Sequence, residues 1–302
     1  MNNEKKIEFY KRRSVGEVLS AGADFIRQNG KVLFKNAFII GGPLACLHGY
    51  FMHKYTVASK YESFMLSGGD LSSFYFNLAF YLITAMALSL FLYSITTAII
   101  SSYGEDKLTP HAGWNDLKGN LFLHVKRILV VSLLVIVAVV LFALVVGAIY
   151  GGLGTFSTAA AFGFLLVIIG FVVVFSPGLS LLVYPAIFHQ QSAGSSIATA
   201  FSLGFRYWGS TFLVLLVSGI VMAVFSYLVA GLYEIWMVFG LKILPMGTVF
   251  EIISYILAII ASLASVVATP VLVTFLAFQY FNIVEQEEGV SVQSEMDEFD
   301  NL

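Results

Sequence analysis

Apolar residues gather along this chain into six long runs that contain almost no charged side chains. A bilayer core about 30 Å thick needs roughly 20 apolar residues for one helical crossing, and several runs reach that length. The run over residues 128–146 is apolar on every face, whereas a strand of a membrane barrel would alternate in polarity. The pattern therefore predicts an all-α polytopic membrane protein with six transmembrane helices. We place them near residues 32–52, 73–100, 128–147, 162–184, 211–232 and 252–280.

Three short amphipathic stretches precede the first, third and fifth apolar runs. Ser14 and Glu17 open the first with the spacing of a capping box, in which each side chain bonds the other residue's backbone N–H. In the second, Pro110 suits the first turn of a helix, where its missing N–H is not needed. The third begins near Ser195 and has apolar residues at helical spacing. We expect three helices along the cytoplasmic interface: residues 14–30, 109–120 and 195–208.

Each amphipathic stretch is followed by a pair of apolar runs, and this order favours three parallel repeats of one unit. The alternative is that any protein with several spans has amphipathic connectors, without internal repetition. The predicted domains are a basic tail (1–13), a six-span membrane domain (14–284) and an acidic disordered tail (285–302). The repeats would cover about residues 14–100, 109–186 and 195–284.

The sixteen Lys and Arg residues are distributed unevenly between the two sets of connections. Thirteen lie in the N-terminal segment and in the second and fourth connections, and only Lys54, Lys60 and Lys242 lie in the others. By the positive-inside rule, both termini are then cytoplasmic. The first thirty residues contain no short apolar stretch with a small-residue cleavage site, so we expect the first span itself to direct insertion.

Composition narrows the classes of function further. The 302 residues are 59% hydrophobic and 11% charged, and a mean hydropathy of +0.88 excludes a soluble globule. The net charge of −2 and the lack of a basic stripe indicate no nucleic-acid partner. Cys46 is the single cysteine, so an internal disulfide is excluded.

Patterns typical of catalytic and metal sites are missing from the sequence. A charged side chain deep in a span is costly and usually functional, but the apolar runs contain essentially none. The five histidines include no i, i+4 pair and no HExxH spacing. His48 and His53 share the external end of the first span and could meet a metal jointly, although separate roles near the interface are the simpler interpretation. We therefore expect no catalytic residue, no metal, no cofactor and no enzyme activity.

Two of the prolines inside predicted spans, one in the fourth span and one in the sixth, should kink their helices. Pro177, which Gly178 follows, and Pro270 each remove a backbone donor and leave a carbonyl group without its usual partner. Such kinks line cavities in some transporters, and they also occur in bundles whose role is purely structural.

Basic and aromatic residues near the interface are the candidates for contact with lipid headgroups, anionic ones in particular. These candidates are Lys11, Arg12, Arg13, Arg206 and Trp208. Each base close to an anionic leaflet contributes about 1 kcal/mol. The acidic residues after Ile283 would be repelled from such a leaflet, and they could instead bind a cytoplasmic protein partner.

The fourth connection carries a family resemblance. Tyr184 and Pro185 end the fourth span, and a polar connection leads into an amphipathic helix that ends in the aromatic and basic cluster 205–208. With the N-terminal segment RRSVGEVLSAGADFIRQNGKVLFKNAFIIGGP, this pattern resembles a bacterial polytopic superfamily that includes the membrane domains of glycerophosphodiester phosphodiesterases. Members often have an acidic residue shortly after the proline, where this chain has His189. The resemblance implies a polytopic fold in the bacterial cytoplasmic (inner) membrane, and it brings no catalytic residue to this chain.

These features together predict a non-enzymatic integral inner-membrane protein that acts as an accessory, scaffold or lipid-associated factor. The alternative is a transporter of a small or lipid-like solute, with a path near Pro177 and Pro270. A central cavity open to water would favour the transporter over the scaffold.

The topology can be tested with single cysteines in a chain whose Cys46 has been replaced by Ser. Cysteines at Ser67 and Ser157 should react with a membrane-impermeant thiol reagent added outside intact cells, because both positions lie in predicted external connections. A cysteine at Ser291 should stay unlabelled until the membrane is permeabilised. Labelling of Ser291→Cys from outside would contradict a cytoplasmic C-terminus.

Overall fold

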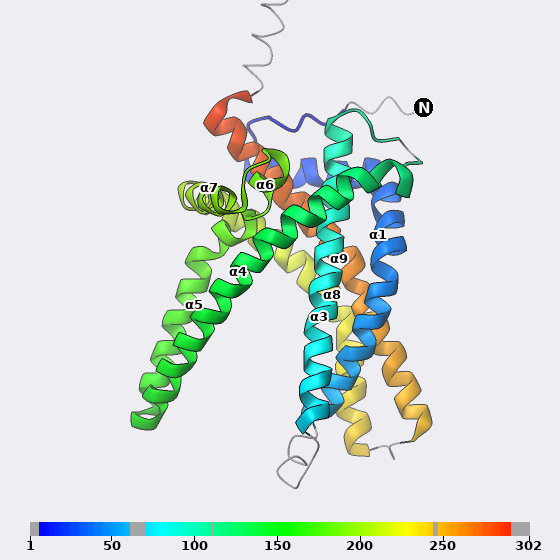
Figure 1. Cartoon of the computed structure of the whole chain (residues 1–302), viewed down its shortest axis with the longest axis vertical. Coiled ribbons are helices and arrows are strands. Elements are labelled where there is room, and N and C mark those ends of the chain that lie inside the picture. Colours follow the sequence, from blue (N-terminus) through cyan, green and yellow to red (C-terminus); the bar gives the residue numbers. More distant parts are fainter. Residues whose placement is uncertain (1–5, 61–70, 110, 244–246, 291–302) are drawn as a thin grey trace, which may run out of the picture. The chain divides into compact units, whose positions relative to one another are not determined.

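The computed structural model describes residues 6–60, 71–109, 111–243 and 247–290. Within these ranges the regular structure is helical, and six helices are long and apolar enough to cross a membrane, by length and composition. The long helices are α1 (Val15–Lys60), α3 (Leu71–Gly104), α4 (Trp114–Phe156), α5 (Thr158–Leu181), α8 (Trp208–Ile243) and α9 (Thr248–Glu288) (Figure 1). The short helices α6 (Tyr184–Phe188) and α7 (Ala193–Arg206) connect α5 to α8. The predicted all-α polytopic fold is confirmed.

The amphipathic stretches differ in how they join the spans. The predicted capping box is present, since the Ser14 N–H donates to Glu17 Oε2 at 2.8 Å and Ser14 Oγ accepts the Glu17 N–H at 3.4 Å. The first stretch nevertheless continues into the span as one helix, α1, because no proline interrupts the chain before Pro43. Only the third stretch is a separate helix, α7, which begins after the N-cap Ser192.

Two predicted boundaries in the middle of the chain are wrong. The second amphipathic helix begins at Trp114 and not at Thr109, because the Gly113 N–H bonds to Asp116 Oδ2 at 2.9 Å and starts the helix there. The third span, predicted to end at residue 147, continues through the glycine-rich segment 147–154, because α4 ends only at Phe156. In an apolar medium a helix is the way for such a segment to satisfy its own backbone groups, so low helix propensity does not end it. Ser157 alone separates α4 from α5.

The last helix also exceeds its predicted length. The acidic tail was expected to begin at residue 285, but α9 continues to Glu288, and Glu285 is buried. The remainder of the predicted tail, residues 291–302, lies outside the described residues.

The chain divides into two compact units. Unit 1 comprises Met1–Ile7, Ala21–Leu121 and Val217–Phe275, and unit 2 comprises Glu8–Ser20, Phe122–Leu216 and Leu276–Leu302. The chain passes between the units at five points, four of which lie inside the long helices α1, α4, α8 and α9, so neither unit is an independent segment of sequence.

In unit 1, α1 and α9 both contribute to two buried cores. Gly41 faces Leu92 of α3 and Val266 of α9, and these helices share a buried core with Ala37 and Ala45. A second core joins α1 to α8 and α9 around the buried side chains Tyr233, Met237, Phe250 and Ala258. The buried Asn36 side chain donates to the carbonyl oxygens of Val32 at 2.8 Å and Ala112 at 3.2 Å, and so fixes the start of the segment that leads into α4.

In unit 2, α7 crosses α5 at a glycine contact. A Cβ atom on Gly204 would lie 2.5 Å from the Gly178 Cα, and a Cβ on Gly178 would lie 2.4 Å from the Phe201 ring. The buried Ser196 hydroxyl ties α6 to α7, because it donates to the Leu182 carbonyl oxygen at 2.7 Å and accepts the Ala186 N–H at 3.0 Å. These contacts hold α7 against the end of α5.

The close approach of α1 to α9 in unit 1 gives a direct test of the packing. A Cβ on Gly49 would lie 2.7 Å from the Ile259 Cα and 2.9 Å from the Ala258 carbonyl oxygen, whereas a Cβ on Gly42 would meet no atom within 4 Å. Gly49→Ala should therefore lower the free energy of unfolding in detergent micelles by about 1–3 kcal/mol through overpacking. Gly219→Ala in α8 of the same unit, where an added Cβ also meets no atom within 4 Å, is the matched control and should leave it unchanged or raise it by up to about 1 kcal/mol through helix propensity. Equal effects of the two substitutions would refute this crossing.

Candidate functional site

The residues that precede α1 form a non-helical strap in unit 2, which we define as residues 8–13. The Phe9 ring stacks on Phe281 of α9 with ring centroids 4.7 Å apart and meets Phe278 edge-on at 5.5 Å. Tyr10 adds an edge contact to Phe281 at 5.4 Å. The Arg13 N–H donates to Asn282 Oδ1 at 2.7 Å. Aromatic packing and one buried amide acceptor therefore hold the strap on the end of α9.

Arg13 stabilises the strap itself. Its guanidinium group donates to the carbonyl oxygens of Phe9 at 3.0 Å and Lys11 at 3.4 Å, and also to that of Glu8. Partial burial lowers the pKa of Arg13, while the charges of Glu8 and Glu17 act in the opposite direction. Of the three strap bases predicted to touch lipid, Arg13 is thus half-buried and engaged with the backbone, whereas Lys11 and Arg12 are exposed.

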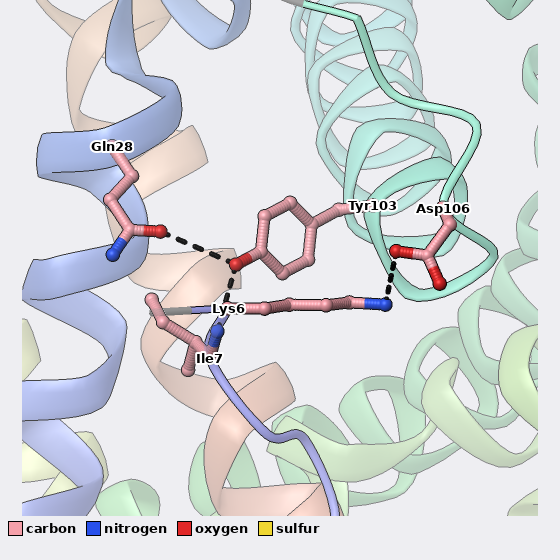
Figure 2. A network of polar contacts seen from close by, with 5 residues as sticks. All are labelled: Lys6, Ile7, Gln28, Tyr103 and Asp106. Atoms are coloured by element: carbon pink, nitrogen blue, oxygen red, sulfur yellow. Dashed lines mark hydrogen bonds and ion pairs between the residues drawn. The ribbon is translucent and has the colours of Figure 1, made fainter. Parts of the chain in front are cut away.

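The two residues before the strap belong to unit 1 and bind the end of α3. Figure 2 shows the Tyr103 hydroxyl, which accepts the Ile7 N–H at 2.9 Å and donates to Gln28 Oε1 at 3.3 Å. The Lys6 ammonium group pairs with Asp106 and lies 5.9 Å from the centre of the Tyr103 ring. Asp106 has a φ of 58°, in the left-handed region that often ends a helix. The Asp106 carboxylate, just after the end of α3, therefore lies next to the Lys6 ammonium group.

The connection between α6 and α7 meets the end of α9 at a histidine–tyrosine pair. His189 Nδ1 lies 2.6 Å from the Tyr280 hydroxyl, and the buried Tyr184 ring stacks on Tyr280 with centroids 5.8 Å apart. Burial lowers the pKa of His189, and the charge of Glu288 opposes that shift. A neutral imidazole can either donate a hydrogen bond to the phenol or accept one from it. This hydrogen bond links the α6–α7 connection to α9.

The two predicted interfacial residues next to α7 have defined partners. Arg206 Nη1 lies 2.5 Å from Glu287 Oε2 on α9. The Trp208 indole N–H donates to the Val174 carbonyl oxygen of α5 at 2.9 Å, and its ring stacks on Phe212 with centroids 4.7 Å apart.

The predicted kink positions are buried. In α5, Pro177 has no N–H to offer the Val173 carbonyl group, and the Ser176 hydroxyl donates to that oxygen at 2.9 Å instead. Gly178 packs against the backbone of Gly204 in α7. In unit 1, Pro270 of α9 is also buried, and the Thr274 hydroxyl donates to its carbonyl oxygen at 2.7 Å.

The histidines of the first span have separate partners in unit 1. His53 Nδ1 lies 3.2 Å from the Tyr233 hydroxyl of α8, and His48 Nδ1 lies 3.2 Å from the Thr84 hydroxyl of α3. In the described part of the chain, no three His, Cys, Asp or Glu side chains come together in a way that could hold a metal ion. The joint metal site considered for His48 and His53 therefore has no support from their geometry.

Sequence reasoning missed the receiving side of the strap. The predicted sixth span, 252–280, ends at Tyr280, and Phe281 and Asn282 follow it without an assigned role. The signal was present in Phe9 and Tyr10, two adjacent aromatic residues in an otherwise polar segment. Such residues need an apolar partner, but the sequence does not tell which one.

Comparison of the chain with models of protein families, with curated proteins and with solved structures finds no match.

Loss of the Phe9 ring should loosen the strap. Two aromatic pairs contribute about 0.5–1.5 kcal/mol each, so trypsin should cleave Phe9→Ala after Lys11 and Arg12 at least about fivefold faster than the wild type. Phe162→Ala, which removes an exposed ring on α5, is the matched control and should leave the cleavage rate unchanged. Unaltered cleavage of Phe9→Ala would mean that the stack does not hold the strap.

Proposed function

We propose that this chain is a non-enzymatic protein of the bacterial cytoplasmic membrane that acts as a lipid-associated scaffold, with the strap as part of its lipid-facing surface. The strap supports this role because its backbone is held on α9 while two of its three bases are exposed. Contacts of Phe9, Tyr10 and Arg13 hold it on α9, yet the side chains of Lys11 and Arg12 remain exposed. Bases held in place lose less conformational entropy when they meet anionic headgroups than bases on a free tail.

The faces of α7 favour a position along the membrane interface. Ser196, Ala200 and Gly204 are buried on one side of the helix. Phe205 is 47% exposed on a neighbouring side. Ser195, Ser202 and Arg206 are exposed on a third side, where polar groups would meet water and headgroups. A helix with a packing side, an apolar side and a polar side is suited to the boundary between lipid and water.

The charge distribution supports the proposal that the strap lies on the cytoplasmic side. Thirteen of the sixteen Lys and Arg residues lie in segments assigned to that side, and the strap bases are among them. The anionic lipids of the cytoplasmic leaflet are then the partners within reach of Lys11 and Arg12.

The surroundings of Pro177 in α5 favour the scaffold over the alternative of a transporter. A transport path at a broken helix uses freed backbone groups to bind the solute. In α5, however, the oxygens of Val173 and Val174 already accept hydrogen bonds from Ser176 and Trp208. A kink whose carbonyl groups are occupied in this way suits a structural bundle.

Hydrogen exchange over residues 8–20 tests the lipid association. In nanodiscs that contain an anionic lipid, this segment should exchange more slowly than in purely zwitterionic nanodiscs. The two exposed bases, at about 1 kcal/mol each, set an upper limit of roughly 30-fold on the difference. The double substitution Lys11→Gln and Arg12→Gln should remove most of the difference without releasing the protein from the membrane. Equal exchange in both lipids would overturn the proposed association.

A further inference from the structure

The end of α6 and the strap contact the same two residues of α9 and their neighbours in unit 2. The Phe281 ring has its centroid 4.7 Å from that of Phe188 on α6 and 4.7 Å from that of Phe9 on the strap. Tyr280 directly precedes Phe281 and is bound by His189, which directly follows Phe188. The surroundings of the Phe281 ring therefore depend on both the strap and the end of α6.

The hydrogen bond between Tyr280 and His189 has a defined direction. In the described part of the chain, the Tyr280 hydroxyl has one hydrogen-bond partner, His189 Nδ1 at 2.6 Å. Tyr280 is 1% exposed, so water offers its phenol no other acceptor. An O–H group left unpaired in a buried place costs free energy, so the phenol donates and Nδ1 accepts. The neutral ring of His189 then carries its proton on Nε2.

Protonation of His189 removes this acceptor. An imidazolium ion has protons on both nitrogens, so Nδ1 is a donor only, and the proton of the Tyr280 phenol is left unpaired. Burial lowers the pKa of His189 from its ordinary value of 6.5, and the charge of Glu288 opposes this shift. The bond is therefore fully present above about pH 6.5, and it is lost as the pH falls from that value through the lowered pKa.

Charged and titratable groups from three elements accompany the histidine. Glu288 of α9 acts on both His189 and Tyr10 of the strap. Burial, followed by the charge of Glu288, raises the pKa of Tyr10, so this phenol stays neutral in acid. On the side of α4, Arg127 donates to the Ile187 carbonyl oxygen at 3.2 Å. One carboxylate and one guanidinium group thus accompany the imidazole at neutral pH.

The backbone is strained directly after His189. Gln190 has a φ of 54°, in the left-handed region that residues other than glycine rarely adopt. Such a conformation persists only where surrounding contacts maintain it. The bond to Tyr280 and the contact of Phe188 with Phe281 are side-chain contacts of this kind at the end of α6. Loss of the bond lets the strained end relax, and Phe188 then leaves Phe281.

We propose that His189 and Tyr280 form an acid-sensitive latch, which holds the strap on α9 while the imidazole is neutral and frees the strap when the imidazole is protonated. The stimulus is a fall in the pH that the strap experiences. The regulatory role of the latch rests on the proposed lipid association, because Lys11 and Arg12 lose their fixed positions when the strap is freed. Acidification then weakens that association.

Hydrogen exchange of the strap measures the state of the latch. The Arg13 N–H is bonded to Asn282 Oδ1, so its protection factor reports whether the strap is closed. The full-length protein would be studied in purely zwitterionic nanodiscs, with rates corrected for the intrinsic effect of pH on exchange. Between about pH 7.5 and pH 5 the protection factor should fall about fivefold, the factor that corresponds to one ordinary hydrogen bond. An unchanged protection factor would overturn the latch.

Substitutions assign the response to the histidine. His189→Asn keeps an acceptor oxygen at the position of Nδ1 but does not titrate, so the strap should stay protected at both pH values. Tyr280→Phe should lower the protection about fivefold already near pH 7.5 and abolish the pH response. His111→Asn, which changes an exposed histidine of unit 1, is the matched control and should keep the wild-type response. A response that persists in His189→Asn would belong to another group, such as His124 of α4, and would overturn the latch.

Nitrogen NMR of the imidazole gives a readout that does not depend on how the variants fold. The side-chain resonances of His189 are those that His189→Asn removes from the spectrum of ¹⁵N-histidine-labelled protein. Near pH 7.5 they should show the tautomer with the proton on Nε2 and with Nδ1 unprotonated. A proton on Nδ1 at this pH would overturn the latch, because the phenol would then not be the donor.

The outcomes separate the latch from the lipid association. The latch is measured without anionic lipid, so its failure would leave any difference between anionic and zwitterionic nanodiscs as evidence for the association. Equal exchange in the two lipids, together with a pH response that His189→Asn abolishes, would overturn the association and the regulatory role and support the latch itself.

Discussion

The need to satisfy every backbone polar group within the chain governs this structure. A bilayer core offers no water to an unpaired N–H or carbonyl group, and each such group costs several kcal/mol there. The constraint explains why the glycines near the end of α4 remain helical, and why α1 runs without interruption over 46 residues. It also explains the surroundings of Pro177. The Ser176 hydroxyl donates to the Val173 oxygen, which lacks a backbone donor because Pro177 has no N–H.

Once every backbone polar group has a hydrogen-bond partner, contacts between the helices determine how they pack. Lipid tails are as apolar as leucine, so burial of apolar side chains cannot by itself select one arrangement. Close backbone approach does so here: Gly49 lies against Ile259 in unit 1, and Gly204 lies against Gly178 in unit 2. Glycines that face open space, such as Gly42, have no such role. The same residue type therefore has different effects according to the neighbour that it meets.

Hydrophobicity made the spans predictable, and local geometry made the cap at Ser14 predictable. Both depend on residues that are close in sequence, and a sequence pattern can only predict interactions between such residues. The strap was not predictable in this way, because the Arg13 N–H and its acceptor Asn282 are 269 positions apart. The headgroup candidates were found from residue type alone. Their different environments, with Arg13 turned to the backbone, Arg206 paired with Glu287 and Arg12 exposed, depend on elements that only the fold brings together.

The pairing of α4 and α5 has a consequence for how the protein enters the membrane. No Lys, Arg, Asp or Glu occurs between Arg127 and Arg206, and Ser157 alone separates the two helices. A translocation machinery that inserts this hairpin has no charged side chain and no extended polar loop to carry across the bilayer. Transfer of the hairpin then costs little beyond its own ordering, because helical pairing satisfies its backbone as it partitions into lipid. The two helices are thus suited to enter together as one unit during synthesis.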